Sequence, residues 1–425
     1  MDEPIQIPSG SGQAGAPLQG RSPTRGVHWP SVLQLGFSLL GMLFFWGVAA
    51  ILFLSGLGQK FLQGISPEQA LPPFLLASGA ALCGFLLLPA GIYAFRRLAG
   101  LPSTRLLRLP AWLNPGWLIL VLPIVLLAGN WIYPREGWAW LFLPPLQALA
   151  VGIPILWFVH LSIRGIASSS PQRHWGVFNA GLVLAPLLSF IFEMLAALLL
   201  VLVWSVWAST QPDLLSELTS LAQRLDQVRF SQEEALALLE PYLTNPAVIS
   251  AVLLFLAAVV PLVEEFVKPI GIWALANRGL RPTDGFVAGV LCGAGFALAE
   301  SLAITSTSEG WVLTVTTRIG TGAIHILASG LVGWALARAW GNRKFVQLGA
   351  TFLLAVLLHG TWNALSVLLV LDYLPASLRE LGPAAWSLIP GELIPYAFAL
   401  LAFIACFTLL GINRLLYRQA ADRIL

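Results

Sequence analysis

Long apolar segments alternate with short polar connections along almost the whole chain. A helix needs about 20 residues to cross the roughly 30 Å hydrocarbon core of a bilayer, at a rise of about 1.5 Å per residue. Ten segments meet this requirement: 35–57, 71–95, 116–133, 139–162, 176–207, 247–276, 284–305, 311–337, 345–371 and 388–411. The pattern predicts an all-α fold, a polytopic transmembrane helical bundle of about ten spans.

Two stretches depart from this pattern. The N-terminal arm is rich in Pro, Gly, Ser and Gln, which predicts disorder. The polar connection before the sixth span has leucines at helical spacing and an acidic excess, which predicts amphipathic helices on the outer face, either covering a site or resting on the bundle. We divide the chain into a disordered arm (1–30), five N-terminal spans without an assigned role (31–207), the amphipathic connection (208–246), a four-span core (247–371), and a last span with a basic tail (372–425).

The positions of Lys and Arg predict the orientation. Ten spans put both termini on one side of the membrane, and sixteen of the 23 Lys and Arg residues fall on that side, against five on the other. Because cytoplasmic connections carry the excess of positive charge, both termini are expected in the cytoplasm. The composition, 57% hydrophobic and 10% charged, is that of a multi-pass cell-membrane protein, and a net charge of +3 gives no indication of nucleic-acid binding.

Charged residues interrupt the sixth span. Glu264, Glu265 and Lys268 lie inside an apolar run, where charges are costly and usually mark a functional site. On a helix, Glu264 and Lys268 share a face, while Glu265 points about 100° away. One carboxylate can therefore be paired while the other takes part in chemistry. The alternative is a structural ion pair between helices.

The three following spans also carry polar groups. Gly285, Gly289 and Gly293 repeat at a spacing that lets helices approach closely. The polar residues are Glu300 on the seventh span, Arg318 and His325 on the eighth, and His359 and Asn363 on the ninth. Counted from the cytoplasmic ends, Glu264, Glu300, His325 and His359 all lie at a depth of roughly 18–24 Å. The four spans are expected to bring these side chains into one layer.

Such a layer contains the groups needed to activate water. A Glu can act as the base while His or Asn steadies an oxyanion, or a metal can activate the water. Taken singly, each His could merely hydrogen-bond a neighbouring helix, and Arg318 could merely neutralise a carboxylate. Two further polar residues within the fifth span, Glu193 and Asn179, are interpreted as structural.

Four motifs on these consecutive spans resemble the PrsW family of intramembrane proteases, within the wider group of CAAX prenyl endopeptidases and bacteriocin-processing membrane proteases. They are Glu264-Glu265-x-x-Lys268, Gly295-Phe296-x-x-x-Glu300, Arg318-x6-His325 and His359-x-x-Trp362-Asn363, within residues 260–365. The family often has a Tyr four residues after the third carboxylate, where this chain has Ile304. That departure leaves the core set intact and bears on substrate details.

The resemblance implies hydrolysis of a peptide bond in a membrane-associated protein, which for the founding member is a membrane-anchored anti-sigma factor. It implies that Glu264 is the base, with Glu265 held by Lys268 or Arg318, although the two glutamates could exchange roles. His359 and Asn363 would bind the oxyanion. His325 would place the water or protonate the leaving amine, and Glu300 completes the expected catalytic set.

The need for a metal and the function itself stay open at this level. No cofactor is favoured, because the chain lacks a His-Glu-x-x-His helix and because Lys268 and Arg318 add positive charge near the site. Zinc is the alternative, with His325, His359 and Glu300 as its ligands. An ion-coupled membrane transporter using the buried Glu, Lys and His groups, or a catalytically inactive membrane scaffold, are the competing functions.

Overall fold

The structure, a computed structural model, is all-helical in the residues that it describes: 28–62, 67–102, 114–166, 169–227, 238, 246–276, 279–304, 310–372 and 390–421. The longer elements are α1 (Trp29–Leu57), α2 (Pro67–Leu98), α4 (Leu122–Ile132), α5 (Glu136–Ile163), α6 (Pro171–Asn179), α7 (Ala185–Ser209), α8 (Pro212–Gln227), α10 (Pro246–Leu254), α11 (Val260–Val267), α13 (Pro282–Ala303), α14 (Trp311–Asn342), α15 (Phe345–Asp372) and α17 (Ile394–Ala421). Short elements join them: α3 (Pro115–Leu118), α12 (Ile270–Trp273), 3-10 turns at Ile119–Val121 and Gly391–Leu393, and π-helical turns at Gly58–Leu62, Ala180–Leu184 and Phe255–Val259.

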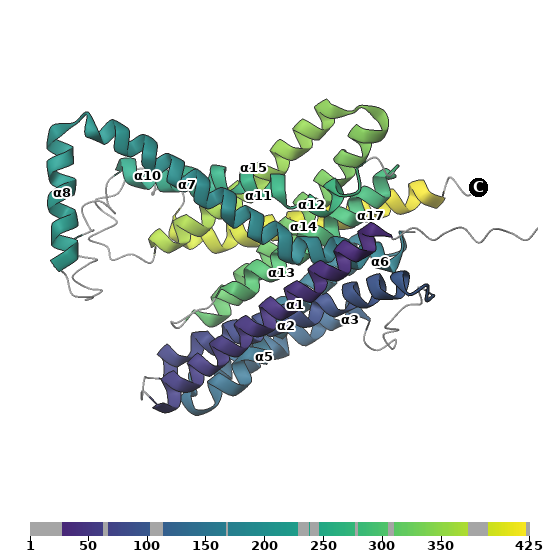
Figure 1. The fold of residues 1–425 in the computed structure, drawn as a ribbon, viewed down its shortest axis with the longest axis horizontal. Coiled ribbons are helices and arrows are strands. Elements are labelled where there is room, and N and C mark those ends of the chain that lie inside the picture. The colour runs from purple at the N-terminus through teal and green to yellow at the C-terminus, as the bar shows by residue number, and fades with distance from the viewer. Residues whose placement is uncertain are drawn as a thin grey trace, which may run out of the picture.

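Ten helical stretches in these ranges are long and apolar enough to cross a membrane, which confirms the predicted all-α, multi-span fold. They are Trp29–Leu62, Ala70–Leu98, Pro115–Ile132, Gly137–Ile163, Pro171–Ser209, Val248–Trp273, Pro282–Ala303, Trp311–Asn342, Phe345–Leu369 and Gly391–Gln419. Helix α8 occupies the first half of the predicted amphipathic connection and projects away from the end of α7 in Figure 1. The predicted arm lies outside the described residues except for its last three.

Helices α13 and α14 are the most deeply buried spans. Their window of highest hydropathy is 78% buried in α13 and 83% in α14, against 44% or less in the other spans. The predicted glycines explain the close approach, since a Cβ added at Gly289 would overlap the backbone of Ser329, and one at Gly293 would overlap the carbonyl of His325. The glycine spacing therefore sets His325 directly against α13.

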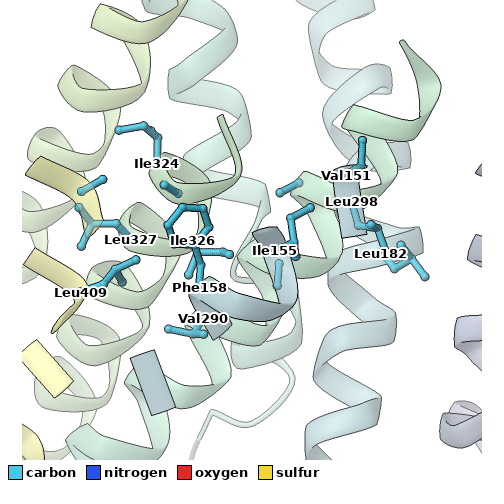
Figure 2. Packing of buried hydrophobic residues seen from close by; sticks show 14 of the residues in the cluster. Val151, Ile155, Phe158, Leu182, Val290, Leu298, Ile324, Ile326, Leu327 and Leu409 are labelled. Atoms are coloured by element: carbon cyan, nitrogen blue, oxygen red, sulfur yellow. The ribbon is translucent and has the colours of Figure 1, made fainter. Parts of the chain in front are cut away.

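The main apolar core surrounds this helix pair. Figure 2 shows Val290 and Leu298 of α13 and Ile324, Ile326 and Leu327 of α14 among side chains that α5, α17 and the π-helical turn Ala180–Leu184 contribute. Helices α1, α2 and α5 lie side by side beyond α13 in Figure 1, and α2 packs against both α1 and α5. Two of the four spans that carry the predicted site residues, α13 and α14, therefore pack against this apolar core.

Helix α7 takes a different position. It packs against α11 and α13 through Ala185, Val267 and Phe296, while most of its later residues are exposed apolar side chains. Figure 1 shows α7 and α13 diverging beyond their contact. One face of α7 consequently borders the helices of the predicted site, and the opposite face is apolar surface suited to lipid.

Candidate active site

The span with the paired glutamates is irregular just before them. Residues Phe255–Val259 form a π-helical turn, and the N–H of Val260 bonds to the carbonyl of Phe255. The carbonyl of Leu256 therefore loses its α-helical donor, and its π-helical donor would be position 261, which is a proline without an N–H. The side-chain amide of Asn363 fills this vacancy by donating a 3.0 Å hydrogen bond to Leu256.

This arrangement fixes where α11 lies against α15. A Cβ at Gly360 would overlap the carbonyl of Ala257, so the two helices meet at backbone contact next to His359. Helix α11 then ends at Lys268, because Pro269 follows directly and cannot continue the helical ladder. The two glutamates and the lysine sit on the last turn of a short helix anchored by Asn363.

The ammonium of Lys268 lies at the centre of the polar cluster. Its Nζ is 2.9 Å from Oε2 of Glu264, 2.6 Å from Oε1 of Glu265 and 2.7 Å from Nδ1 of His325. An ammonium has three N–H donors. Glu265 and His325 each accept a hydrogen bond from it, and Glu264 forms an ion pair with it. The ring of Phe296 closes a further side, with its centroid 4.5 Å from Nζ. The side chain is fully buried, so every one of its polar contacts comes from the protein.

A second ion pair, between Arg318 and Glu300, holds His325 on the side opposite Lys268. Because Lys268 can only donate, Nδ1 of His325 accepts, and its proton sits on Nε2, which donates to Oε2 of Glu300 at 2.7 Å. The other oxygen of Glu300 is 2.7 Å from the Arg318 guanidinium. The resulting chain of charge-assisted contacts runs from Arg318 through Glu300 and His325 to Lys268, and it joins α13, α14 and α11.

His359 completes the cluster from α15. Its Nδ1 lies 3.0 Å from Oε1 of Glu265, and its ring stands perpendicular to that of His325 with centroids 4.8 Å apart. A carboxylate only accepts, so the proton of His359 belongs on Nδ1 and leaves Nε2 with a free lone pair. That Nε2 is 3.7 Å from Oε2 of Glu264. A water oxygen can bond to both atoms at an ordinary distance of about 2.8 Å.

The two adjacent glutamates differ in their surroundings. The Glu265 side chain is completely buried and is bound by Lys268 and His359. The Glu264 side chain is 10% exposed, and it contacts the ammonium of Lys268 and, at a longer distance, a nitrogen of His359. Glu264 is therefore the more accessible carboxylate of the pair, and Glu265 is the one that holds the cluster together.

The structure brings seven of the eight predicted site residues into one contiguous network. The exception is Asn363, which bonds to the backbone of Leu256 and has no described contact with the cluster. Arg318 pairs with Glu300 rather than with Glu265. Sequence reasoning missed the anchoring role of Asn363, although Pro261, which follows the π-helical turn and removes the other possible donor to Leu256, is visible in the sequence.

The donor atoms suit a metal ion in kind. Glu264, His325 and His359 each offer one ligand atom, and these atoms lie within 4.8 Å of one another. The expected third ligand was Glu300, but here Glu264 is grouped with the two histidines, and Glu300 instead bonds to Nε2 of His325 and pairs with Arg318. However, Nζ of Lys268 already contacts the His325 and Glu264 atoms of this set and is 3.4 Å from Nδ1 of His359. A dication cannot share that position with the ammonium, so the set does not fit a metal while Lys268 remains in place.

Comparison with protein families matches the part of the chain that carries the cluster. Residues 232–381 match the family described as PrsW family intramembrane metalloprotease. The match includes α11, α13, α14 and α15, and so it contains every residue of the cluster. No curated protein and no solved structure matches the chain. This match and the ten helices of membrane-spanning length support a multi-pass membrane protease.

Proposed function

We propose that the protein is an intramembrane endopeptidase in which Glu264 activates the hydrolytic water. The observation that carries this proposal is the pairing of Glu264 Oε2 with His359 Nε2 across 3.7 Å. A water between them would donate one hydrogen to the carboxylate and the other to the imidazole. Both hydrogens are then held, and the oxygen lone pairs point away from the two side chains toward an incoming carbonyl carbon.

The reaction follows from these positions. The water oxygen attacks the carbonyl carbon of the peptide bond while its proton moves to Glu264. The ammonium of Lys268, 2.9 Å from the same carboxylate oxygen, lowers the energy of the negative charge that develops on the tetrahedral intermediate. Cleavage of the C–N bond then returns the proton from Glu264 to the leaving amine. Glu265 orients His359 by accepting its Nδ1 proton.

The remaining residues act through Lys268. Glu300 holds the Nε2–H tautomer of His325, and His325 in turn accepts a hydrogen bond from the ammonium. Arg318 keeps Glu300 ionised. We propose that Asn363 supports the site by bonding to Leu256 and that it does not bind the oxyanion.

We propose that this chemistry proceeds without a metal. The positive charge that a zinc ion would supply is supplied by Lys268, which contacts two of the three candidate ligand atoms. A chelated enzyme should therefore keep its activity. If one equivalent of zinc co-purifies, and if activity is lost on its removal and restored on its addition, the metal-free proposal is wrong.

The substrates of a membrane protease are membrane proteins, and we propose single-span proteins of the anti-sigma-factor type. The test co-expresses the chain with a panel of tagged single-span reporters, one with an anti-sigma-factor-like arrangement. Fragments should appear with the wild type and be absent with Glu264→Gln. Glu392→Gln serves as the control, because Glu392 is an exposed carboxylate at the start of another span. Equal fragments with Glu264→Gln and wild type would refute the role of Glu264.

A further inference from the structure

Helix α7 carries two polar residues that the proposed reaction leaves unused. Ser189 and Glu193 lie four residues apart on the face that begins with Ala185. Ala185 packs against Val267 of α11 and Phe296 of α13. The face bearing both polar residues therefore continues along the helices that carry Glu264 and Glu300.

Their level along the bundle can be derived from this contact. As the fifth and seventh spans, α7 and α13 cross in the same direction, so Ser189 and Glu300 each lie four residues, or about 6 Å, beyond it. Glu193 lies about one helical turn further. Glu193 interacts electrostatically with Glu264, Lys268 and Glu300, so its carboxylate lies within electrostatic range of the cluster.

Each of these two residues has a buried polar atom that makes no hydrogen bond to the described protein. Oε1 of Glu193 and Oγ of Ser189 are buried atoms without a hydrogen-bond partner among the described residues. The Ser189 side chain is not simply folded back on its own helix, as Ser162 and Ser205 are when they donate to the carbonyl four residues earlier. Only 3% of the surface of Ser189 is exposed. Asn179, which we also interpreted as structural, does have a partner in Ser38, so Glu193 stands apart.

The charges of the cluster explain why no cation among the described residues pairs with Glu193. Lys268 is taken by Glu264, Glu265 and His325, and Arg318 is taken by Glu300. Neighbouring positions on α7, such as Phe192 and Met194, are exposed and apolar. A carboxylate in such a place is costly unless something binds it. In Figure 1, α7 and α13 diverge beyond their contact.

We propose that Glu193 and Ser189 form a substrate-binding subsite that accepts a basic side chain, lysine or arginine, from a membrane-spanning peptide. The peptide approaches from the lipid along α7, and its cation pairs with Glu193 next to the reacting bond. This inference deepens the proposed protease function, because it supplies a preference for substrates with a basic residue flanking the cleavage position. Glu193 is a specificity-determining residue in this scheme.

The test measures binding without cleavage. The full-length protein carries Glu264→Gln and is reconstituted in lipid nanodiscs. The probes are dye-labelled single-span peptides with a Leu and Ala core and one lysine, which is moved over eight successive positions. Matched probes carry norleucine instead. At the positions that reach Glu193, lysine should improve affinity about 10-fold, the value of roughly one hydrogen bond to a charged group.

Four further variants decide the assignment. Glu193→Gln should abolish the preference for lysine, and Glu193→Lys should transfer it to a probe carrying glutamate, which a residue needed only for folding would not do. Ser189→Ala should weaken the preference, and Glu392→Gln should leave it unchanged. The subsite is refuted if lysine and norleucine probes bind equally at all eight positions, or if the preference survives Glu193→Gln. A chain that binds lysine through Glu193 but cleaves no reporter would retain the subsite and refute the protease mechanism.

Discussion

The Nζ atom of Lys268 lies 2.7 Å from Nδ1 of His325, although 57 positions separate the two residues and they come from different spans. Because an ammonium has no lone pair, Nδ1 of His325 must be the acceptor in this contact, and the ring proton is on Nε2. That N–H donates a hydrogen bond to Glu300. One short contact thus determines the tautomer of a buried histidine. Through His325 it also connects the Glu300 carboxylate to the ammonium that pairs with Glu264 and Glu265.

The same contact explains how a positive charge can be buried completely. A lone ammonium in an apolar bundle would be strongly unfavourable, and its burial is tolerated only where geometry and additional hydrogen bonds compensate. Lys268 meets this condition through Glu264, Glu265 and His325. Removing the ammonium should therefore leave several acceptor atoms close together and unpaired, which is the arrangement that a metal ion binds.

The first prediction is that Lys268→Met creates a zinc site. The substitution removes the charge and keeps an unbranched side chain, so Glu264, His325 and His359 become free to act as ligands within their 4.8 Å group. The purified variant should take up one equivalent of zinc after chelation and should gain thermal stability on zinc addition, whereas the wild type should do neither. Metal content by mass spectrometry and a melting curve measure both effects.

Two controls make that result specific. Lys268→Arg keeps a cation at the position and should bind no zinc, and Lys268→Met combined with His325→Ala should lose the gained site. A wild-type protein that already binds one zinc with the same dependence on His325 would show that Lys268 moves aside, and it would contradict the metal-free proposal.

The second prediction separates the two adjacent glutamates. Glu264→Gln should reduce turnover by about 10²–10⁴-fold, the usual contribution of a positioned general base, with little change in the melting temperature. Glu265→Gln should lower the melting temperature clearly, because it breaks a fully buried ion pair whose loss costs on the order of 3 kcal/mol. Reporter cleavage and melting in the same detergent preparation would test the pair. The reverse pattern would make Glu265 the base.

The third prediction concerns Asn363. If its task is to satisfy the carbonyl of Leu256, then Asn363→Ala should cost about 1–3 kcal/mol of stability, because it leaves a backbone acceptor unpaired inside a membrane span, where no water replaces the lost donor. Activity measured well below the melting temperature should fall only a few-fold. A loss of more than 100-fold with unchanged stability would instead support Asn363 as an oxyanion donor, which the family resemblance implies.

Sequence reasoning located the ten spans because their signal is local. Each is a run of apolar residues of membrane length, and the structure differs mainly at the ends, as in the fifth span, which begins at Pro171 rather than at 176. The approach of α13 to α14 was also visible, since Gly289 and Gly293 have no other use at that spacing. Charged residues in these spans were expected to pair with one another in the bundle interior, because charges in lipid are costly.

Sequence reasoning missed the features that depend on irregular backbone or on unsatisfied atoms. The partner of Asn363 is a backbone carbonyl that only a π-helical turn exposes, and neither the turn nor the approach of α15 at Gly360 has a periodic signature. Glu193 resembled any single polar residue in a span until its lack of a partner became visible. Helical depth alone also cannot say on which side of His325 a carboxylate lies, so sequence reasoning named Glu300 as a candidate ligand where the structure groups Glu264 with the two histidines.

The fourth prediction tests orientation, which rests on the distribution of Lys and Arg. Single cysteines are introduced at Arg343, an exposed residue between α14 and α15, and at Gln223, an exposed residue of α8. In intact cells an impermeant maleimide should label position 223 and should reach position 343 only after permeabilisation. The native cysteines lie within the spans, and the unsubstituted chain provides the background. Labelling of position 343 in intact cells would invert the topology.

The last prediction concerns Gly293, the residue that sets the distance between α13 and α14 beside His325. A methyl group there would lie 2.5 Å from the carbonyl oxygen of His325 and 2.9 Å from the Ser329 side chain, so the helices must separate. Overpacking of this kind typically costs about 1–3 kcal/mol, and a small separation would lengthen the His325 to Glu300 contact, now 2.7 Å. Gly293→Ala should therefore lower both the melting temperature and reporter cleavage. Gly349→Ala is the matched control, because nothing lies within 4 Å of its added methyl group, and helix propensity alone makes alanine the better residue there. If Gly293→Ala cleaves and melts like Gly349→Ala, close packing of α13 on α14 is not what holds the cluster in register.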